Sequence, residues 1–573
     1  MNEKNLYELW LKNANDDADL IEELKSIKNN DAEICDRFYM DLKFGTAGLR
    51  GIIGAGTNRI NIYTIRKATQ GLANYLNSKH KNASVCISFD SRIKSDLFAK
   101  EAAQVLAANK IKVHIVRELN PVPFLSFATR ELKCNAGIMI TASHNPSIYN
   151  GYKCYGPDGC QMTDKASNDV FNFIEKLNPF TDIKTCDFEA ALADKIINYI
   201  DDSITIKYLE KVKEQSVNPG ICEGSDLKVV YTPLNGSGNK LVKKILNDTG
   251  IENISVVKEQ ENPDGNFPTC TYPNPEDPKA LTLAIDLAKQ KNADLVIATD
   301  PDSDRIGIAV LNNNEYRLMT GNEVGVLLLY YILSQRSKKH NLPQNPVIVK
   351  TIVSTDLADK IAKKYNCEVR NVLTGFKYIG EQILELEKNN EEHRFIFGFE
   401  ESYGYLAGSY VRDKDGVVAA MLVCEMAAYY KNQKKSLANV MTELYNDFGH
   451  HKSSILNYGF KGAEGMTKME KIMDSLRQNP PEKICNYNVE KIADYFLSKK
   501  TNIKTGKSFD ITLPKSNVIS YFLKNGNKVI VRPSGTEPKI KVYITSVGKD
   551  LDESQKISEK IIEQIPSVLK INN

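Results

Sequence analysis

The sequence predicts an α/β fold divided into several domains. Three observations support this prediction. The chain has 573 residues, about four times the length of a typical domain. Short apolar runs rich in β-branched residues alternate with stretches of helix length. After about residue 455 the pattern changes to closely spaced strand-like runs. We therefore expect three consecutive α/β domains, followed by a smaller C-terminal α+β domain.

The elements follow in order along the chain. The first 38 residues are charged, with Leu6, Trp10, Leu20 and Leu24 at helical spacing, which predicts a helical extension over residues 1–40. In the last domain, Asn525-Gly526-Asn527 predicts the turn of an antiparallel hairpin. We expect a first domain over residues 41–200, with buried strands at 84–90, 112–116 and 137–142. A second domain is expected over 201–320, with strands at 227–233, 254–258 and 294–300. A third is expected over 321–450, with strands at 346–352 and 394–400, and the fourth covers 451–573.

Composition narrows the class of function. Lysine and arginine number 75 and aspartate and glutamate 72, so the net charge of +3 offers no field to attract nucleic acid or an acidic membrane surface. The longest apolar stretch, residues 324–333, is about half of a bilayer span, and the N-terminus carries no hydrophobic leader. Eleven scattered cysteines without a C-x-x-C pair favour reduced thiols over disulfides or zinc. We expect a cytoplasmic protein without a nucleic-acid or membrane partner.

A first polar loop, T-A-S-H-N-P (141–146), directly follows an apolar strand and precedes N-G-Y-K (150–153). Ligands in open α/β sheets gather at the carboxyl ends of strands. A serine exposed there, Ser143, beside His144 and near Lys153, could act as a nucleophile or carry a phosphoryl group. The alternative is an ordinary Asn-Pro turn with incidental polar residues.

A second loop, D-P-D-S-D-R (300–305), follows the strand expected over 294–300. Carboxylates at alternate positions, Asp300, Asp302 and Asp304, can present hard oxygen ligands to one divalent cation. An EF-hand calcium loop would need glycine and glutamate at its sixth and twelfth positions, which here are Arg305 and Leu311. Magnesium in an open, phosphate-facing site fits better, and a solvated acidic turn is the alternative.

Two further loops end apolar strands. G-F-E-E-S-Y-G (398–404) could bind vicinal sugar hydroxyls through a carboxylate and a hydroxyl, although the triplet is also common on surfaces. R-P-S-G-T-E-P-K (532–539) offers an arginine, two hydroxyls and glycine-exposed N–H groups, which together suit a phosphate; a simple Pro-Ser-Gly turn is the alternative.

Together these motifs resemble one family. FGTAGLRG (44–51), TASHNP with NGYK, DPDSDR, GFEES and RPSGTEP occur in the order found in α-D-phosphohexomutases, specifically the phosphoglucomutase/phosphomannomutase subgroup that includes phosphopentomutase-like members. The resemblance spans nearly the whole chain. It implies mixed sheets in the three α/β domains, a TATA-binding-protein-like fourth domain, and a central cleft between them.

The resemblance also implies roles for individual residues. Ser143 matches the serine that carries phosphate, as phosphoserine, and that completes the magnesium site of Asp300, Asp302 and Asp304. The residues matched to catalysis are Ser143, His144, Arg50, Lys153 and Lys414. The residues matched to substrate binding are Arg305, Thr374, Gly375, Lys377, Glu400, Ser402, Arg532, Ser534, Gly535 and Thr536. Asn235 stands where related sequences often have histidine, and Tyr403 occupies a position that is often another residue.

The implied activity is reversible interconversion of α-D-glucose 1-phosphate and glucose 6-phosphate, and of mannose phosphates as well. It proceeds through phosphoserine and a hexose 1,6-bisphosphate, with Mg²⁺ as cofactor and glucose 1,6-bisphosphate as activator. A phosphopentomutase, a glucose-1,6-bisphosphate synthase and, more remotely, a non-catalytic phosphosugar-binding protein are the alternatives. The partners are small sugar phosphates, and the chain is expected to be a monomer or a dimer.

Overall fold

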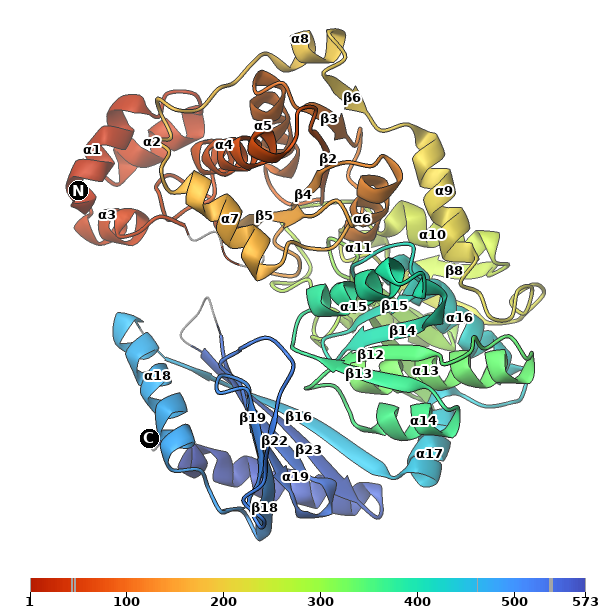
Figure 1. The fold of residues 1–573 in the computed structure, drawn as a ribbon. Coiled ribbons are helices and arrows are strands. Elements are labelled where there is room, and N and C mark those ends of the chain that lie inside the picture. The colour runs from red at the N-terminus through yellow and green to blue at the C-terminus, as the bar shows by residue number, and fades with distance from the viewer. Residues whose placement is uncertain (1, 43–44, 46–47, 461, 535–538, 572–573) are drawn as a thin grey trace.

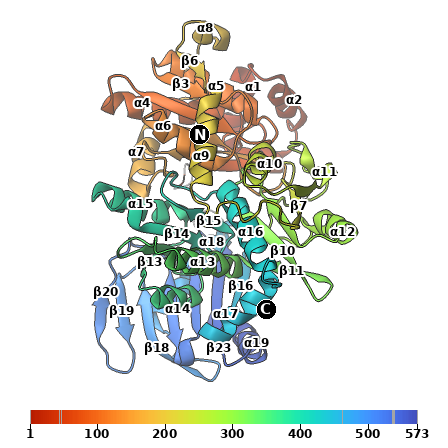
Figure 2. The same ribbon diagram turned by 90° about the vertical axis from the view of Figure 1, so that its right-hand side faces the viewer.

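A computed structural model describes residues 2–42, 45, 48–460, 462–534 and 539–571. Four sheets follow one another along the chain, and the helices pack against them (Figures 1 and 2). The first three sheets mix parallel and antiparallel pairs, and the strands of the fourth are antiparallel neighbours. Three α/β domains with mixed sheets and a C-terminal domain were predicted, and this fold class is confirmed.

The N-terminal residues form three short helices, α1 (Glu3–Asn13), α2 (Ala18–Ser26) and α3 (Asp31–Phe38). Trp10 is 1% exposed and makes edge contacts with the rings of Phe38, Tyr63 and Phe180. Aromatic packing of this kind fixes the extension on the first domain.

The first domain has a six-stranded sheet in the order β1-β5-β4-β2-β3-β6. Strands β2 and β4 are parallel neighbours, with Phe89 opposite Ile140, so the segments that follow them leave the sheet side by side. Its elements are β1 (Leu49–Ile52), α4 (Ile62–Lys79), β2 (Ser84–Phe89), α5 (Ser95–Ala108), β3 (Lys112–Ile115), α6 (Val122–Glu131), β4 (Ala136–Ile140), β5 (Tyr149–Tyr155), α7 (Asp164–Ile174), α8 (Phe188–Ala193) and β6 (Ile197–Tyr199), and α9 (Asp202–Lys213) leads to the next domain.

The second domain has a five-stranded sheet in the order β11-β10-β9-β7-β8. Strand β9 turns through residues 300–305 into its antiparallel neighbour β10, so the three aspartates lie at the carboxyl end of β9. The elements are β7 (Lys228–Thr232), α10 (Asn239–Asp248), β8 (Asn253–Val256), α11 (Lys258–Glu261), α12 (Thr282–Lys291), β9 (Leu295–Thr299), β10 (Ile306–Asn312) and β11 (Glu315–Met319).

The third domain has a four-stranded sheet in the order β13-β12-β14-β15. The β14–β15 turn carries residues 401–403, and Asp415 caps the long helix α16 by accepting bonds from the N–H groups of Val417 and Val418. The elements are α13 (Gly321–Lys338), β12 (Val347–Thr351), α14 (Leu357–Lys364), β13 (Glu368–Val372), α15 (Phe376–Lys388), the 3₁₀ turn η1 (Glu392–Arg394), β14 (Phe395–Glu400), β15 (Gly404–Ala407), α16 (Gly416–Lys431) and α17 (Leu437–Phe448).

The fourth domain carries its sheet in the order β16-β23-β22-β21-β18-β19-β20, with the short β17 beside β18. The predicted hairpin is present: β21 pairs antiparallel with β22, and Asn525 takes the left-handed conformation in the turn, with φ 66°. The elements are β16 (His450–Gly459), α18 (Gly462–Gln478), β17 (Lys483–Ile484), β18 (Tyr487–Asp494), β19 (Lys499–Asn502), β20 (Ser508–Asp510), β21 (Ile519–Leu523), η2 (Lys524–Gly526), β22 (Lys528–Pro533), β23 (Lys539–Gly548) and α19 (Leu551–Val568).

The cores show how the domains are joined. One continuous cluster of buried apolar side chains includes Phe124 of the first domain, Ile297 of the second and Phe397 of the third. The fourth domain has its own core, including Tyr521 and Ile561. We infer that the first three domains pack as one body, with the fourth sheet beside the third domain (Figure 1).

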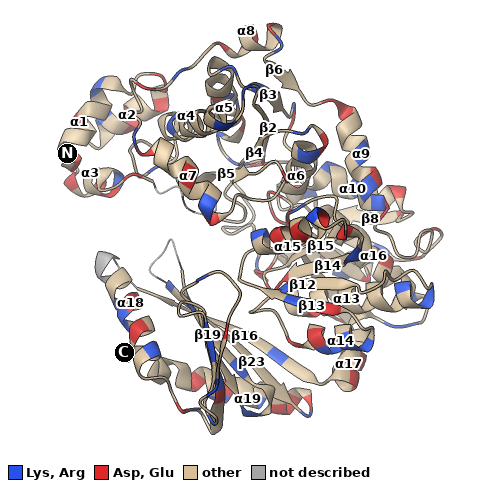
Figure 3. Ribbon diagram, in the orientation of Figure 1, with Lys and Arg blue, Asp and Glu red and all other residues tan. Residues whose placement is uncertain are grey.

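Residues of both charge signs occur on helices in all four domains (Figure 3). The apolar stretch at 324–333 lies inside the buried helix α13. Within the described part of the chain, no helix is long and apolar enough to cross a membrane.

Candidate active site

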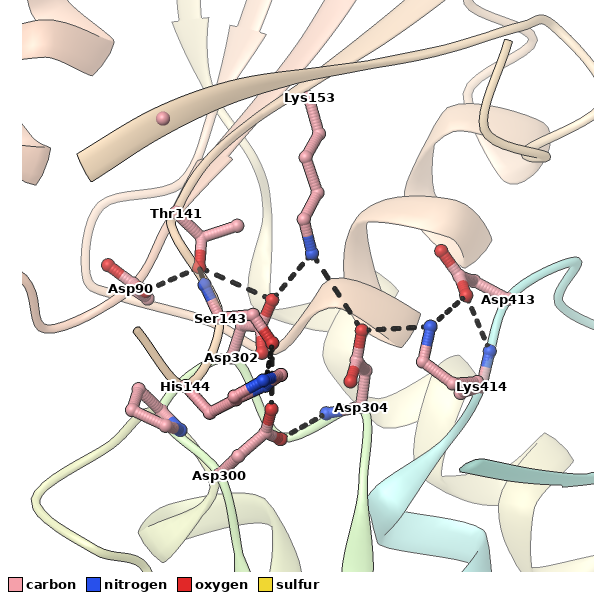
Figure 4. Close-up of polar contacts among 12 residues, drawn as sticks. Asp90, Thr141, Ser143, His144, Lys153, Asp300, Asp302, Asp304, Asp413 and Lys414 are labelled. Atoms are coloured by element: carbon pink, nitrogen blue, oxygen red, sulfur yellow. Dashed lines mark hydrogen bonds and ion pairs between the residues drawn. The ribbon is translucent and has the colours of Figure 1, made fainter. Parts of the chain in front are cut away.

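Ser143 lies just after β4, and its backbone is left-handed, with φ 53°. Its Oγ is 3.0 Å from Asp300 Oδ2, to which it can donate, and 3.1 Å from His144 Nδ1 (Figure 4). Its backbone N–H donates to Thr141 Oγ1 at 2.8 Å. The sequence predicted an exposed serine, which is wrong: Ser143 is 4% exposed, because the aspartate loop of the second domain packs against it.

Asp300, Asp302 and Asp304 are each at most 2% exposed, and one ligand oxygen from each lies within 4.8 Å of the others. The second oxygens of Asp302 and Asp304 are buried without a hydrogen-bond partner. Unpaired buried carboxylate oxygens are costly, and a hard divalent cation would satisfy them. The donor set therefore fits Mg²⁺, and residues 300–305 are called the metal loop below.

Burial and mutual repulsion dominate the electrostatics of the metal loop. Burial raises the pKa of Asp300, and the charges of Asp302 and Asp304 raise it further. Burial also acts to raise the pKa of Asp302, but the nearby ammonium of Lys153 outweighs it and lowers that pKa. Three carboxylates thus lie close together at a dry position, where their interaction with a bound cation is strong.

Three successive carbonyls hold the metal loop in place. Pro301 O accepts from the N–H of Ser237 at 2.8 Å, Asp302 O from the N–H of Val122 at 2.9 Å, and Ser303 O from the N–H of Gly416 at 3.1 Å. Because these donors belong to the second, first and third domains respectively, the loop lies where all three meet.

Two lysines contact the metal loop from different domains (Figure 4). Lys153 Nζ of β5 is 2.8 Å from Asp302 Oδ2, and Lys414 Nζ is 3.1 Å from Asp304 Oδ2. Burial acts to lower the pKa of Lys414, but the carboxylates of Asp304, Asp413 and Glu400 outweigh it, so this pKa is raised well above its usual value. Lys414 therefore stays a cation at neutral pH, and Asp413 Oδ1 holds it at 3.0 Å.

Arginine and histidine complete the serine side of the site. Arg305 donates its backbone N–H to Asp300 Oδ1 at 3.1 Å, and its NH1 lies 2.8 Å from Glu276 Oε1. Arg50 is exposed and donates to Asn145 Oδ1 at 3.4 Å. Burial lowers the pKa of His144 well below its usual value, and the cations Arg305 and Arg50 add to the effect, so the ring is neutral.

The predicted sugar-binding residues belong to two loops of the third domain. Glu400 is 5% exposed and its charge acts on Lys414 and Arg305, so it lies beside the metal loop; Ser402 is half-buried in the next turn. Lys377 forms an ion pair with Asp164 of α7. Two residues earlier, Gly375 has a φ of 124°, and the Oγ1 of Thr374 is buried without a hydrogen-bond partner. The first loop reaches the metal site, and the second faces the first domain.

Arg532 ends β22 on the face of the fourth sheet that packs toward the third domain. Burial raises the pKa of both Glu401 and Tyr378, and the positive charge of Arg532 acts to lower both, which places Arg532 near these two residues. Ser534 donates its backbone N–H to Lys539 O at 2.7 Å. Gly535 and Thr536 lie outside the described residues.

Asn235 has a supporting structural role beside the metal loop. Its side-chain N–H groups donate to Asn262 O at 2.8 Å and Glu259 O at 3.3 Å. Nearby, a side chain on Gly236 would place its Cβ 2.5 Å from the Cα of Pro301. This turn therefore packs directly against the metal loop.

Sequence reasoning missed Asp90 and Arg92, which follow β2 and contact residues 141–149, called the serine loop below. Asp90 Oδ2 accepts from Thr141 Oγ1 at 2.6 Å, and Arg92 donates to Ser143 O. The available signal was that residues 84–90 were predicted to be a strand, whose carboxyl end is where site residues gather.

A buried serine, a three-carboxylate cation site and flanking cations together define an α/β protein equipped for phosphoryl chemistry. Matches to known proteins agree with this class. Residues 41–179, 206–313 and 320–448 match the models for phosphoglucomutase/phosphomannomutase α/β/α domains I, II and III, and residues 493–564 match the C-terminal domain. The chain belongs to the phosphoglucomutase/phosphomannomutase family.

Relatives match over nearly the full length. A phosphoglucomutase of Staphylococcus saprophyticus is 38% identical over 546 residues, which are 95% of this chain and 97% of the relative. That of Staphylococcus aureus strain MRSA252 is 38% identical over 560 residues, 97% and 98% of the two chains.

Solved structures agree on the fold. The open form of the Paramecium exocytosis-sensitive phosphoprotein pp63/parafusin, a phosphoglucomutase, gives a TM-score of 0.68 at 18% identity, covering 93% of this chain and 95% of that one. A phosphoglucomutase/phosphomannomutase family protein of Burkholderia thailandensis gives a TM-score of 0.66 at 16% identity, and the match covers 92% of this chain and 97% of that one.

Proposed function

We propose that the protein interconverts α-D-glucose 1-phosphate and glucose 6-phosphate, and acts on mannose phosphates as well, with Ser143 as the phosphoryl carrier. One observation carries the proposal: the Ser143 hydroxyl lies 3.0 Å from Asp300 Oδ2, at a buried three-carboxylate site. The relatives named phosphoglucomutase support glucose as the sugar.

The chemistry consists of two matched transfers. In the first, the P–Oγ bond of phospho-Ser143 breaks as a new P–O bond forms to the free 6-hydroxyl of glucose 1-phosphate. The hydroxyl proton is lost from the sugar, and one proton is regained by Ser143 Oγ. The resulting 1,6-bisphosphate then turns over in the site. In the second transfer the bond between the sugar O1 and its phosphorus breaks as a new P–Oγ bond forms to Ser143. Oγ loses its proton and O1 gains one, which releases glucose 6-phosphate and restores phospho-Ser143. The same bisphosphate, added from outside, would phosphorylate Ser143 and activate the enzyme.

Positioning and neutralisation of charge supply most of the catalysis in such transfers. Lys153 and the protonated Lys414 lie on either side of the metal loop and would face the negative phosphoryl oxygens. Asp300, Asp302, Asp304 and an oxygen on Ser143 would hold Mg²⁺, which supplies further positive charge when bound. Neutral His144 can exchange a hydrogen bond with Ser143 Oγ.

The remaining predicted residues are proposed to bind substrate between the four domains, in a central cleft. Arg50 and Arg305 would face the reacting phosphate. The sugar hydroxyls would be bound by residues of the third domain: Glu400, Ser402, Thr374, Gly375 and Lys377. The distal phosphate would be bound by residues of the fourth domain: Arg532, Ser534, Gly535 and Thr536. We also propose domain boundaries after residues 40, 200, 320 and 450, a cytoplasmic location, and a monomer or dimer.

A substrate panel tests the sugar. With catalytic glucose 1,6-bisphosphate and Mg²⁺ present, we expect turnover of glucose 1-phosphate to exceed that of mannose 1-phosphate and ribose 1-phosphate. Preference for ribose 1-phosphate would instead identify a phosphopentomutase. Net accumulation of bisphosphate from another phosphoryl donor would identify a synthase.

The role of Ser143 is tested by Ser143→Ala. We expect the variant to fold, to take up no phosphate from glucose 1,6-bisphosphate, and to lose turnover, because Ser143 is the one hydroxyl that donates to Asp300 among the described residues. Phosphate uptake is measured by intact mass. Full bisphosphate-dependent turnover by the variant would refute the proposed function, and binding without turnover by the wild type would favour a phosphosugar-binding protein.

A further inference from the structure

Arg92 is an arginine buried behind the Ser143 loop, and its side chain is 0% exposed. Its Nε and NH2 donate to Ser143 O at 3.2 and 2.6 Å, and NH2 also donates to Asn145 O. Its NH1 donates to Pro146 O and Tyr149 O, both at 2.9 Å. One guanidinium therefore binds four carbonyls of the serine loop, using the fixed fork of donors that only arginine has.

These bonds determine which way the serine points. A left-handed backbone costs a non-glycine residue about 1–2 kcal/mol, and Ser143 has φ 53°. Arg92 holds the carbonyl of Ser143, while Thr141 Oγ1 accepts from its N–H at 2.8 Å. With both of its peptide groups held, the serine side chain is directed away from Arg92 and toward Asp300.

Asp90 joins this arrangement to the metal loop. Its Oδ2 lies 3.6 Å from Arg92 Nε and accepts from Thr141 Oγ1 at 2.6 Å. The same Thr141 oxygen lies 3.2 Å from Asp302 Oδ2 (Figure 4). The ring of Phe267, from the second domain, lies 5.0 Å from the guanidinium carbon. Asp90 and Arg92 thus both contact the serine loop, and Thr141 links Asp90 to Asp302 of the metal loop.

We propose that Arg92, held by Asp90, is a positioning residue for phosphoryl transfer: it fixes the direction of Ser143 Oγ without touching substrate. The inference rests on the proposed function. A displacement of about 1 Å at a reacting atom can cost about a hundredfold in rate. A lysine has one compact ammonium and cannot bind four carbonyls at once. Arg92→Lys should therefore keep the charge and lose the alignment.

The test compares Arg92→Lys with Arg59→Lys. Arg59 is a matched control, because it is 6% exposed and also binds carbonyls, those of Asn58 and Asp36, outside the site. For Arg92→Lys we expect kcat on glucose 1-phosphate to fall about a hundredfold, with KM within about threefold of wild type. Arg59→Lys should keep both values. An unchanged kcat in folded Arg92→Lys would overturn the inference, whereas an inactive wild type would instead overturn the proposed function.

A second measurement separates misalignment from a loss of folded enzyme. Each protein is incubated with glucose 1,6-bisphosphate, and phosphorylation of Ser143 is followed by intact mass. A positioning role predicts that every chain of Arg92→Lys is phosphorylated, but slowly. A normal rate with reduced stoichiometry would mean that part of the protein is misfolded and would overturn the inference.

Asp90→Asn covers the case in which Arg92→Lys does not fold. The isosteric amide keeps the shape of the Asp90 side chain and removes the negative charge beside Arg92. We therefore expect Ser143 to be phosphorylated in every chain but slowly. We also expect kcat to fall at least tenfold, which corresponds to an activation free energy about 1.4 kcal/mol higher. A normal kcat would overturn the inference. If Arg92→Lys and Asp90→Asn both fail to fold while Arg59→Lys folds, Arg92 and Asp90 are needed for stability, and the inference would also be overturned.

Discussion

Replacing Asp302 by asparagine tests whether the metal loop is built for a cation. Asp302 Oδ2 lies 2.8 Å from Lys153 Nζ, an attraction of about 6 kcal/mol at an effective dielectric constant of about 20. Ligand oxygens of Asp300 and Asp304 lie within 4.8 Å of it, so each repels it by at least about 3.5 kcal/mol on the same scale. The lowered pKa of Asp302 means that the attraction outweighs repulsion and burial, so the negative charge of Asp302 stabilises the folded state. We therefore expect the metal-free variant to lose about 3 kcal/mol in free energy of unfolding, because Lys153 is left with the more distant Asp304 at 3.8 Å.

The response to Mg²⁺ and the catalytic rate should change as well. In wild type, free Mg²⁺ at about a hundredfold excess over its Kd should stabilise the folded state by about 2.7 kcal/mol. Asp302→Asn should lose most of this stabilisation, and its kcat should fall by about 10²–10³. The assays are urea unfolding with and without Mg²⁺, and turnover of glucose 1-phosphate in a Mg²⁺ titration.

A matched control removes a partly buried ion pair away from the site. Asp494→Asn breaks the contact between Arg477 Nε and Asp494 Oδ2, which is 3.1 Å long and lies in the fourth domain. This variant should lose stability and keep both its Mg²⁺ response and kcat. Equal Mg²⁺ stabilisation and kcat in Asp302→Asn and wild type would refute the assignment of the metal loop.

Two further variants test the surroundings of the site. Burial, with the charge of Glu400, raises the pKa of Glu401 from 4.5 to about 7, so the folded state keeps a proton that the unfolded chain loses. Stability should therefore fall as pH rises from about 4.5 to about 7, and Glu401→Gln should reduce this fall in urea unfolding; identical pH profiles would contradict the assignment. A Cβ on Gly416 would lie 2.5 Å from Ser303 O, so Gly416→Ala should shift the metal loop and lower kcat at least about tenfold. Gly459→Ala is the control and should keep kcat, because nothing lies within 4 Å of its added Cβ. Equal kcat in the two variants would show that the metal loop tolerates the added Cβ.

Most of the fold could be predicted because buried parallel strands have a simple sequence pattern. The apolar runs at 84–90, 137–142 and 294–300 appear as β2, β4 and β9 with nearly those bounds. The antiparallel additions were missed, because strands such as β5 (YNGYKCY) and β11 (EYRLM) carry polar side chains and do not show a continuous apolar run.

The metal loop was predictable for a similar reason, since three carboxylates at alternate positions directly follow a strand. Contacts between distant segments were not. The Lys377–Asp164 pair joins residues 213 apart in sequence. The role of Arg92 depends on Phe89 lying opposite Ile140 in the sheet, which no local pattern reveals. The burial of Ser143 likewise depends on how the second domain packs on the first.

Each of the three carbonyls of the metal loop binds a backbone N–H group, and Pro301 O also accepts from Ser237 Oγ at 2.8 Å. A change of the Val122 side chain leaves its N–H in place, unless it introduces proline, whereas a Cβ on Gly416 would lie 2.5 Å from Ser303 O. A rigid displacement of the first or the third domain, by contrast, would move the N–H group that binds Asp302 O or Ser303 O. The backbone of the metal loop, and with it the carboxylates, would shift. The cation site therefore depends on how the three domains are assembled as well as on the residues around it.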